Sequence, residues 1–192
     1  MKPTPFLLLL PLVWAGGACA DSAAQRATSA AVWRQSQKTD AANTMTFTRF
    51  TLVGKFTQPQ AAGTNPPTLA LDCIPASLSH NAKGKFLAAN LLVGTTLKIV
   101  YVEPEEIRGT SYFPKVVVQY RADGAKGEEE KWSASTDKTS LSVPKDSLKK
   151  ILRAHTVAIT ADNDQGAPVG MSFDLPASPL AEDGCNVDEH AE

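Results

Sequence analysis

The chain has 192 residues, with 19 basic and 20 acidic side chains and a formal net charge of −1. This near-neutral balance gives no basic footprint for nucleic acid, so we expect no nucleic-acid partner. Hydrophobic residues make up 43% of the chain, which is enough to bury a core and excludes a disordered acidic chain. The length predicts one domain.

The first 20 residues have the pattern of a signal peptide. Lys2 precedes an apolar run over residues 6–13, and Ala18-Cys19-Ala20 forms a small-residue cleavage site before Asp21. The apolar run is about half of the ~20 residues that a membrane span needs. We therefore predict an exported protein, periplasmic or secreted, without a transmembrane segment. Removal of 20 of the 192 residues leaves 172, with a net charge of about −2 and two of the three cysteines.

Cys19 leaves a second interpretation of the N-terminus open. A cysteine after Gly17-Ala18 at the end of a signal resembles the bacterial lipoprotein processing site, although Gly16 stands where that pattern usually has leucine. We expect a soluble mature protein, because small residues occupy the cleavage positions. Lipid anchoring through Cys19 is the alternative.

Composition divides the rest of the chain into three parts. Residues 21–32 are rich in Ala and Ser and predict a loose N-terminal segment. Residues 33–185 predict a single β-rich domain, and the acidic residues 186–192 predict a disordered tail. Trp33, which has no periodic neighbours, is expected to plug the core, with an exposed binding anchor as the alternative.

Alternation of apolar and polar residues, together with β-branched and aromatic residues, predicts seven strands. In chain order they cover residues 46–56, 68–73, 96–102, 115–121, 131–135, 156–161 and 169–175. The apolar run 86–93 is left ambiguous between strand and helix. The strands at 115–121 and 131–135 predict a hairpin with a longer loop, in which Glu128–Glu130 is expected to be a solvated loop end.

One segment has a helical period, over residues 148–155. Ser142 is its predicted N-cap, and His155 is the predicted capping or packing residue at its C-terminal end. Ser178-Pro179 and Gly184 predict a short C-terminal helical turn. About seven strands with one amphipathic helix predict a mainly β fold, either an antiparallel β-sandwich or a half-open barrel.

The two cysteines of the mature chain, Cys73 and Cys185, predict a disulfide. An even cysteine count in an exported protein is typical of a structural bridge. A redox pair or metal site is the alternative, but neither a Cys-x-x-Cys motif nor a histidine at ligand spacing supports it. Cys73 alternates with Leu69 and Leu71, which places it on the core face of its strand.

The motifs G-x-S-x-G, G-x-G-x-x-G and H-E-x-x-H and the Walker loop are not in the sequence. We therefore expect no enzyme, no cofactor and no metal. The alternative is a small periplasmic hydrolase whose site combines His80 with scattered acidic residues such as Asp137. Asp162–Gly166 resembles the start of a calcium loop, but its twelfth position is Phe173 instead of Glu, so we predict a hairpin turn.

The charged loop over residues 103–111 is the predicted contact surface for a partner. Loops on a rigid sandwich often carry binding residues. This loop provides Glu105 and Arg108, and Tyr112 and Phe113 follow it. An ordinary solvated loop is the alternative.

The order of several short motifs resembles a known family. Trp33 precedes a polar stretch with Thr39-Asp40, and Leu69–Cys73 is a predicted strand that ends in cysteine. Lys131–Asp137 reads Lys-Trp-Ser-Ala-Ser-Thr-Asp before the helix, and Cys185 follows the last strand. This order resembles the VasI/TagO family of periplasmic proteins associated with type VI secretion.

The resemblance implies a β-rich accessory protein of the cell envelope and no catalytic residues. Together with the export signal, it favours a non-enzymatic protein that binds an envelope protein or a cell-wall component. A purely structural domain without a ligand is a further alternative. The sequence predicts no oligomeric state.

Overall fold

The computed structural model describes residues 31–39, 46–61, 63–75, 85–104, 112–181 and 184–185. Within them the chain forms eleven β-strands, one α-helix and one short 3-10 helix. The predicted signal peptide, the Cys19 anchor, the tail 186–192 and nearly all of the segment 21–32 lie outside the described residues.

All strand pairs between the described strands are antiparallel. The strands are β1 (Arg34–Thr39), β2 (Thr46–Val53), β3 (Lys55–Phe56), β4 (Thr68–Pro75), β5 (Lys85–Leu92), β6 (Tyr101–Pro104), β7 (Tyr112–Ala122), β8 (Glu128–Ala134), β9 (Ser140–Ser142), β10 (Thr156–Asp162) and β11 (Pro168–Asp174). The helices are α1 (Lys145–Arg153) and η2 (Pro179–Ala181). No helix in the described part of the chain has the length and apolar character needed to cross a membrane.

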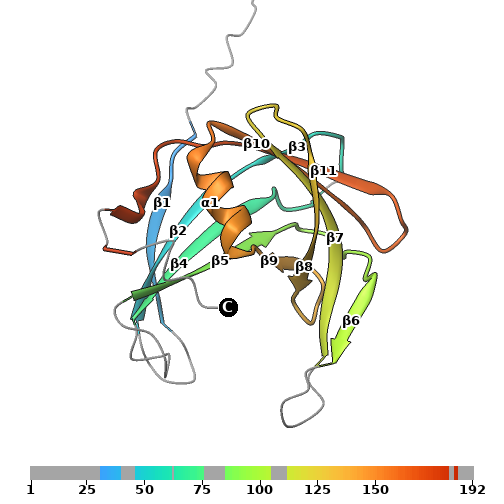
Figure 1. Ribbon diagram of the computed structural model, residues 1–192, viewed down its shortest axis with the longest axis horizontal. Helices are drawn as coiled ribbons and strands as arrows, with labels where there is room; N and C mark the ends of the chain where they lie inside the picture. The colour runs from blue at the N-terminus through green and yellow to red at the C-terminus, as the bar shows by residue number, and fades with distance from the viewer. Residues whose placement is uncertain are drawn as a thin grey trace, which may run out of the picture.

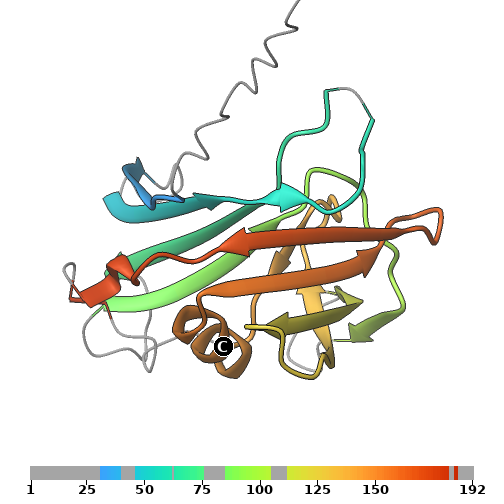
Figure 2. The same cartoon turned by 90° about the horizontal axis from the view of Figure 1, so that it is seen from above.

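The strands form one sheet that curls into a half-open barrel (Figures 1 and 2). Its hydrogen-bonded order is β1-β2-β4-β5-β9-β8-β7-β10-β11-β3, and β6 pairs with β7 outside this path. β3 directly continues β2, so one bent strand pairs first with β4 and then with β11. The half-open barrel is therefore the correct one of the two predicted architectures, but with eleven strands in place of about seven.

Gly54 allows the bend between β2 and β3. A Cβ atom at this position would lie 2.5 Å from Cε1 of Phe173 and 2.7 Å from the carbonyl oxygen of Ser172. The N–H group of Gly54 donates to the carbonyl of Pro67 at 2.8 Å. Glycine in a strand often marks a sharp bend where another backbone approaches closely. Here it lets the strand pass from β4 to β11 without a clash.

Four strands account for the difference from the predicted number. β1 forms in the polar segment after Trp33, where all six strand residues are exposed and the sequence therefore has no alternation. β5 resolves the ambiguous run 86–93 as a strand. β3 and β9 contain only two and three residues, too few for a pattern to emerge.

The strand predicted over residues 96–102 is wrong in its bounds. β6 begins only at Tyr101, and before it Leu97 makes a single antiparallel bridge to Asn163. Leu97 is buried, whereas Val100 is 47% exposed. The apolar–polar alternation over residues 96–100 therefore does not mark a paired strand. Its one fully buried side chain is Leu97, which packs into the core.

The segment Asp162–Gly166 forms the turn between β10 and β11, so the predicted hairpin turn is confirmed. The side-chain oxygen of Asn163 accepts hydrogen bonds from the N–H groups of Gln165 and Ala167, at 3.1 and 2.9 Å. Gly166 has a φ of +79°, which glycine adopts without strain. Asparagine and glycine are typical of turns for these reasons.

α1 packs Leu148 and Ile151 into the core of the barrel, where both are fully buried. The residue before the helix is Pro144, whose carbonyl accepts the N–H of Leu148 at 2.8 Å. The predicted N-cap Ser142 is wrong, because Ser142 belongs to β9 and the extended backbone of Pro144 already ends the strand and starts the helix.

Trp33 packs against the core from the segment before β1, as predicted. It is half-buried, and its indole nitrogen is buried without a hydrogen-bond partner in the described part of the chain. The apolar ring surface, and not the N–H group, therefore accounts for its position.

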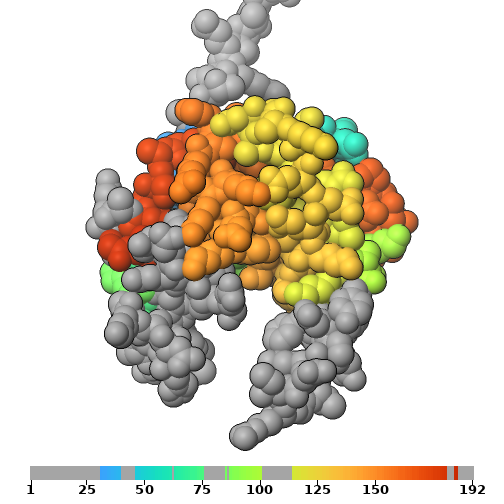
Figure 3. Space-filling view, in the orientation of Figure 1, coloured from blue at the N-terminus to red at the C-terminus, as the bar shows by residue number. Residues whose placement is uncertain are grey.

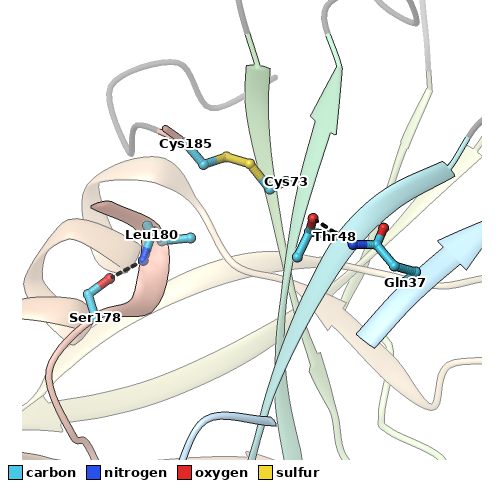
Figure 4. Close-up of a disulfide and its surroundings, with 6 residues drawn as sticks. All are labelled: Gln37, Thr48, Cys73, Ser178, Leu180 and Cys185. Atoms are coloured by element: carbon cyan, nitrogen blue, oxygen red, sulfur yellow. Dashed lines mark hydrogen bonds between the residues drawn. A yellow bond between two sulfur atoms is a disulfide. The ribbon is translucent and has the colours of Figure 1, made fainter. Parts of the chain in front are cut away.

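A disulfide links Cys73 on β4 to Cys185, just after η2 (Figure 4). The two Cα atoms are 5.9 Å apart, a separation typical of disulfides. The register of the sheet places Thr48 of β2 beside Cys73, and Gln37 of β1 beside Thr48. The bridge thus fastens the C-terminal segment to the β1–β2–β4 part of the sheet.

Replacing Cys73 and Cys185 together by serine is expected to lower the free energy of unfolding by about 2–5 kcal/mol, because a cross-link over such a long loop restricts the unfolded chain. Urea unfolding of the oxidised parent and the double variant measures the difference. The reduced parent is the control and should unfold like the variant. Two alkylated thiols in unreduced parent protein would contradict the bridge.

Candidate functional site

A polar cluster joins α1 to the β7–β8 hairpin, against which the helix lies in Figure 3. Its centre is Glu130 on β8, which is half-buried. The carboxylate accepts hydrogen bonds from the indole N–H of Trp132 at 2.8 Å, from the hydroxyl of Tyr120 at 3.2 Å, and from the hydroxyl of Ser147 on α1. Trp132, Tyr120 and Ser147 are all buried. The three donors hold the helix against the hairpin.

Glu128 extends this cluster toward the solvent. Its carboxylate accepts a hydrogen bond from Nζ of Lys150 at 2.5 Å and lies 3.2 Å from the Tyr120 hydroxyl. The Lys150 ammonium lowers the pKa of Glu128, and Glu128 in turn raises the pKa of Lys150. Burial raises the pKa of Tyr120. At neutral pH the cluster therefore holds a charged Lys150–Glu128 pair beside a neutral tyrosine.

The expectation that Glu128–Glu130 ends a solvated loop is wrong. These three residues begin β8, and two of them bind side chains of α1 or the core. The sequence shows only three adjacent acidic residues. In the structure, the register of β8 with β7 places Glu128 and Glu130 on the same face of the sheet as Tyr120, and both carboxylates lie within hydrogen-bond distance of its hydroxyl.

Ser147 and Lys150 have the Ser-x-x-Lys spacing of some serine hydrolases, a spacing that also occurs at Ser135–Lys138 and Ser142–Lys145. A nucleophilic serine needs access to a substrate and a basic partner within hydrogen-bond reach. Ser147 is 1% exposed, and its hydroxyl donates to Glu130. The raised pKa of Lys150 keeps its ammonium protonated, on Glu128. This pair therefore positions α1 and does not form a nucleophile with its base.

Asp137, a residue of the alternative hydrolase site, lies in the turn between β8 and β9. Its carboxylate accepts hydrogen bonds from the Ser135 hydroxyl at 2.5 Å and from the N–H of Thr139 at 3.1 Å. These bonds, that of Ser135 above all, lower the pKa of Asp137. His80 lies outside the described residues. Within the described ranges, no three His, Cys, Asp or Glu side chains form a group able to hold a metal ion.

Asp123 links the end of the β7 turn to the residues after α1. Its Oδ1 accepts hydrogen bonds from the N–H groups of Thr156 and His155, at 2.8 and 2.9 Å. These backbone bonds, that of Thr156 first, lower the pKa of Asp123. The predicted capping or packing role of His155 is wrong, because α1 ends at Arg153 and the His155 side chain is 93% exposed.

The predicted contact loop lies mostly outside the described residues, including Glu105 and Arg108. Tyr112 and Phe113 are the first two residues of β7, where the backbone pairs with β6. The structure describes the backbone of these two residues and not their side chains. A partner contact at this loop stays a prediction.

A trough crosses the outer face of β7, β10 and β11, on the side of the sheet away from the core. It consists of two adjoining hollows of 390 and 180 Å³, which share Gln119 and Thr160. The floor is β10, whose buried residues alternate with the outward-facing Ala158, Thr160 and Asp162. We name this hollow the β10 trough.

The register of the sheet explains why the surface is hollow here. Thr160 pairs with Gln119 of β7 on one side and with Gly170 of β11 on the other. Ala158 pairs with Arg121 of β7. The smaller residues of β10 and β11 therefore form the floor of the hollow. The long side chains of Gln119 and Arg121, on β7, form one of its walls.

The β10 trough has unpaired cations at its two ends. Lys98 lies at the end beside Asp162, whose carbonyl accepts the Lys98 N–H at 2.9 Å, and Arg121 lies beside Ala158 at the other end. Four residues of strand separate these ends, about 13 Å. Neither cation forms a hydrogen bond or ion pair through its side chain with another described residue. The hydroxyl of Thr160, between them, is likewise unpaired within the described residues.

Comparisons with protein-family models, with curated proteins and with solved structures find no match. The resemblance to the VasI/TagO family therefore stays a prediction. Sequence reasoning did not find the β10 trough, because its residues have only the polar–apolar alternation of any strand with one face in solvent. The Ser-x-x-Lys spacing is not a specific signal for the cluster on α1, because it occurs three times in the chain.

The variant Glu130→Gln is expected to lower the free energy of unfolding by about 1–3 kcal/mol, because the new amide turns a donor toward the buried donors of the cluster. Glu129→Gln is the matched control, since Glu129 is exposed and bonds Gln119 on the outer face. Its effect should stay within about 0.5 kcal/mol. Urea unfolding followed by tryptophan fluorescence compares the two, and equal effects would contradict the role given to Glu130.

The variant Asp123→Asn is expected to be less stable than the parent at neutral pH and to approach it in acid. The folded-state pKa of Asp123 is lowered, so its stabilisation is complete above the ordinary value near 3.8 and is lost as the pH falls through the folded value. Urea unfolding between about pH 7 and about pH 3 tests this. Both proteins should carry His155→Gln, which removes the titration of the neighbouring imidazole. A stability difference that does not change with pH would refute the assignment.

Proposed function

We propose that this protein is an exported, non-enzymatic binding protein whose β10 trough holds a carboxylate-bearing chain of the cell wall. The observation that carries the proposal is the pair of cations, Arg121 and Lys98, at the two ends of the trough, unpaired within the described residues. Between them lie the hydroxyl of Thr160 and the amide of Gln119, whose N–H already donates to Glu129 at 3.2 Å. The two cations and the Thr160 hydroxyl suit an extended polar chain with acidic groups.

The chemistry of the trough favours a polar polymer over a folded protein partner. Protein interfaces are anchored by large aromatic or aliphatic side chains in well-packed pockets. Val100, which is 47% exposed, lines the trough together with Ala158, Val117 and Pro168, and none of these four side chains is aromatic. Hydroxyl, amide and carboxylate groups of a cell-wall chain instead match the donors directly, and charge-assisted hydrogen bonds are the strong ones.

Binding without cleavage is favoured by the acidic residues at the trough. Hydrolysis of a glycan usually requires a pair of carboxylates about 5–9 Å apart. Asp162 is the only acidic residue among those that line the two described hollows. The Ser147–Lys150 pair lies at the α1 cluster, where the hydroxyl is buried. No second function is favoured by a particular contact.

Export is supported by the signal-like N-terminus and by the Cys73–Cys185 bridge, because disulfides persist in oxidising compartments. The resemblance to the VasI/TagO family supports a place in the cell envelope, as an accessory factor of type VI secretion. Both points agree with a ligand in the cell wall.

The test is co-sedimentation of purified, oxidised protein with isolated insoluble cell wall. The double variant Arg121→Ala/Lys98→Ala is expected to bind about tenfold more weakly, because it loses the charged donors at both ends. The matched control is Lys126→Ala/Arg153→Ala, which removes the same charge from two exposed positions outside the trough. It should bind like the parent.

Two outcomes would overturn the proposed function. Failure of the parent to sediment with cell wall would contradict a cell-wall ligand and favour the purely structural alternative. Equal weakening in both double variants would show that any loss of positive charge suffices, and that the trough is not the site.

A further inference from the structure

β1 and β11 approach the same side of the bent strand that runs from β2 into β3, and they leave a gap between them. β1 pairs with β2 as far as Arg34, which lies opposite Thr51. β11 pairs with β3 from Ser172, which lies opposite Lys55. Val53 lies between these two pairs, and neither register includes it. We name the gap around Val53 the β1–β11 seam.

The backbone of Val53 faces this seam. The N–H groups of a strand alternate between its two sides. The N–H of Gly54 donates to a carbonyl on the side of β4, at 2.8 Å, whereas the N–H of Thr57 donates to a carbonyl of β11, at 2.9 Å. Val53 therefore points its N–H and C=O to the same side as Thr57. No described strand pairs with Val53 on that side.

The two registers explain why the position stays open. If β1 continued its register by two residues, Val32 would lie opposite Val53. If β11 continued its own, Asp174 would lie opposite the same residue. One position cannot pair with both strands on one side, so the strands separate and Val53 pairs with neither.

The seam opens as a hollow of 590 Å³, which we name the seam hollow and which shares no lining residue with the β10 trough. Its apolar wall includes Val32, Val53 and Pro66. Val32 is 65% exposed and Val53 is 44% exposed, and they are two of the four large hydrophobic side chains exposed among the described residues. Exposed apolar groups that gather in one groove are typical of a binding site.

The seam hollow also holds one unbalanced positive charge. Lys55 and Asp174 line it and form an ion pair with each other at 3.5 Å. Arg34 lines it as well, and its guanidinium makes no hydrogen bond or ion pair with another described residue. Arg34 is a diagonal neighbour of Val53, about 7–8 Å away across the strand pair. An anionic group bound beside Val53 is therefore within reach of this cation.

We propose that the seam hollow binds the C-terminal residue of a partner polypeptide that ends in an apolar side chain. The guanidinium of Arg34 donates to the terminal carboxylate, a geometry that suits arginine. The last side chain packs against Val32 and Val53, and the last peptide group pairs with the backbone of Val53. Main-chain pairing then provides affinity, and the pocket provides specificity.

The number of open backbone positions favours a chain end over an internal segment. Because β1 and β11 flank Val53, a longer strand would have to continue into one of them, whereas the last residue of a chain does not. An alkyl carboxylate would match the apolar wall and Arg34, but it has no N–H group to donate to the Val53 carbonyl. A C-terminal residue matches all three features. This inference is independent of the β10 trough and of its cell-wall ligand.

An array of six-residue peptides with free C-termini tests the proposal. The last residue is varied and the other positions are randomised, and the full oxidised chain, fluorescently labelled, is the probe. We expect the strongest signal for peptides that end in Val, Ile or Leu. Amidation of the terminal carboxyl group should weaken the binding of the best peptide about tenfold, because it removes the charge that Arg34 binds.

Variants of the chain locate the peptide, with affinities measured by fluorescence anisotropy in solution. Arg34→Gln should bind the free acid about tenfold more weakly and no longer distinguish it from the amide, whereas Arg34→Lys should keep most of the preference. Lys38→Gln is the matched control, since it removes the same charge from the same face of β1 outside the hollow. It should bind like the parent.

The apolar wall is tested with Val53→Thr, which keeps the shape of the side chain and adds a hydroxyl. It should weaken peptides with an apolar last residue about threefold. Val100→Thr is its control, because Val100 is an exposed valine of the β10 trough. Urea unfolding of each variant verifies that it is folded.

Three outcomes would overturn the proposal. One is an array signal that does not depend on the last residue or on its free carboxyl group. Another is a loss of binding in Val100→Thr and not in Val53→Thr, which would place the peptide in the β10 trough. The third is decanoate that binds as tightly as the best peptide and depends on Arg34, which would favour a fatty acid as the ligand.

Discussion

The fold depends on one strand shared between two parts of the sheet. β2 pairs with β1 and β4, its continuation β3 pairs with β11, and Gly54 at the junction leaves room for the ring of Phe173. Because the same strand holds both regions, the sheet curls around a single core and does not separate into two stacked sheets. α1 covers this core with Leu148 and Ile151, and the trough lies on the outer face of β10.

The two faces of the curled sheet use charge in different ways. At the α1 cluster, the carboxylates of Glu130 and Glu128 accept hydrogen bonds from the helix and the hairpin. Their charge therefore stabilises the contact between α1 and the β7–β8 hairpin. On the outer face, Arg121 and Lys98 have no side-chain partner among the described residues. A satisfied polar network specifies structure, whereas charged groups without a partner are available to a ligand. For this reason the trough, and not the cluster, is the site at which we propose binding.

Local patterns were sufficient for much of the fold. Alternation predicted β4, β7, β8, β10 and β11, the helical period predicted α1, and Asn163 with Gly166 predicted the last hairpin turn. The same patterns failed for β1, whose residues are all exposed, and for residues 96–100, where alternation reflects one buried side chain in a crossing segment. Both failures have one cause, since alternation reports which side chains are buried and not whether the backbone is paired.

The sequence by itself determined the β-rich class, the amphipathic helix and the two cysteines available for a bridge. Only the tertiary structure decided which strands are neighbours, and therefore that Ser147 meets Glu130, that small residues of β10 and β11 lie between longer ones, and that Cys185 is bonded to β4. The physical reason is distance along the chain. Periodicity expresses burial over a few residues, whereas closure of the sheet and the register between remote strands depend on how the whole core packs.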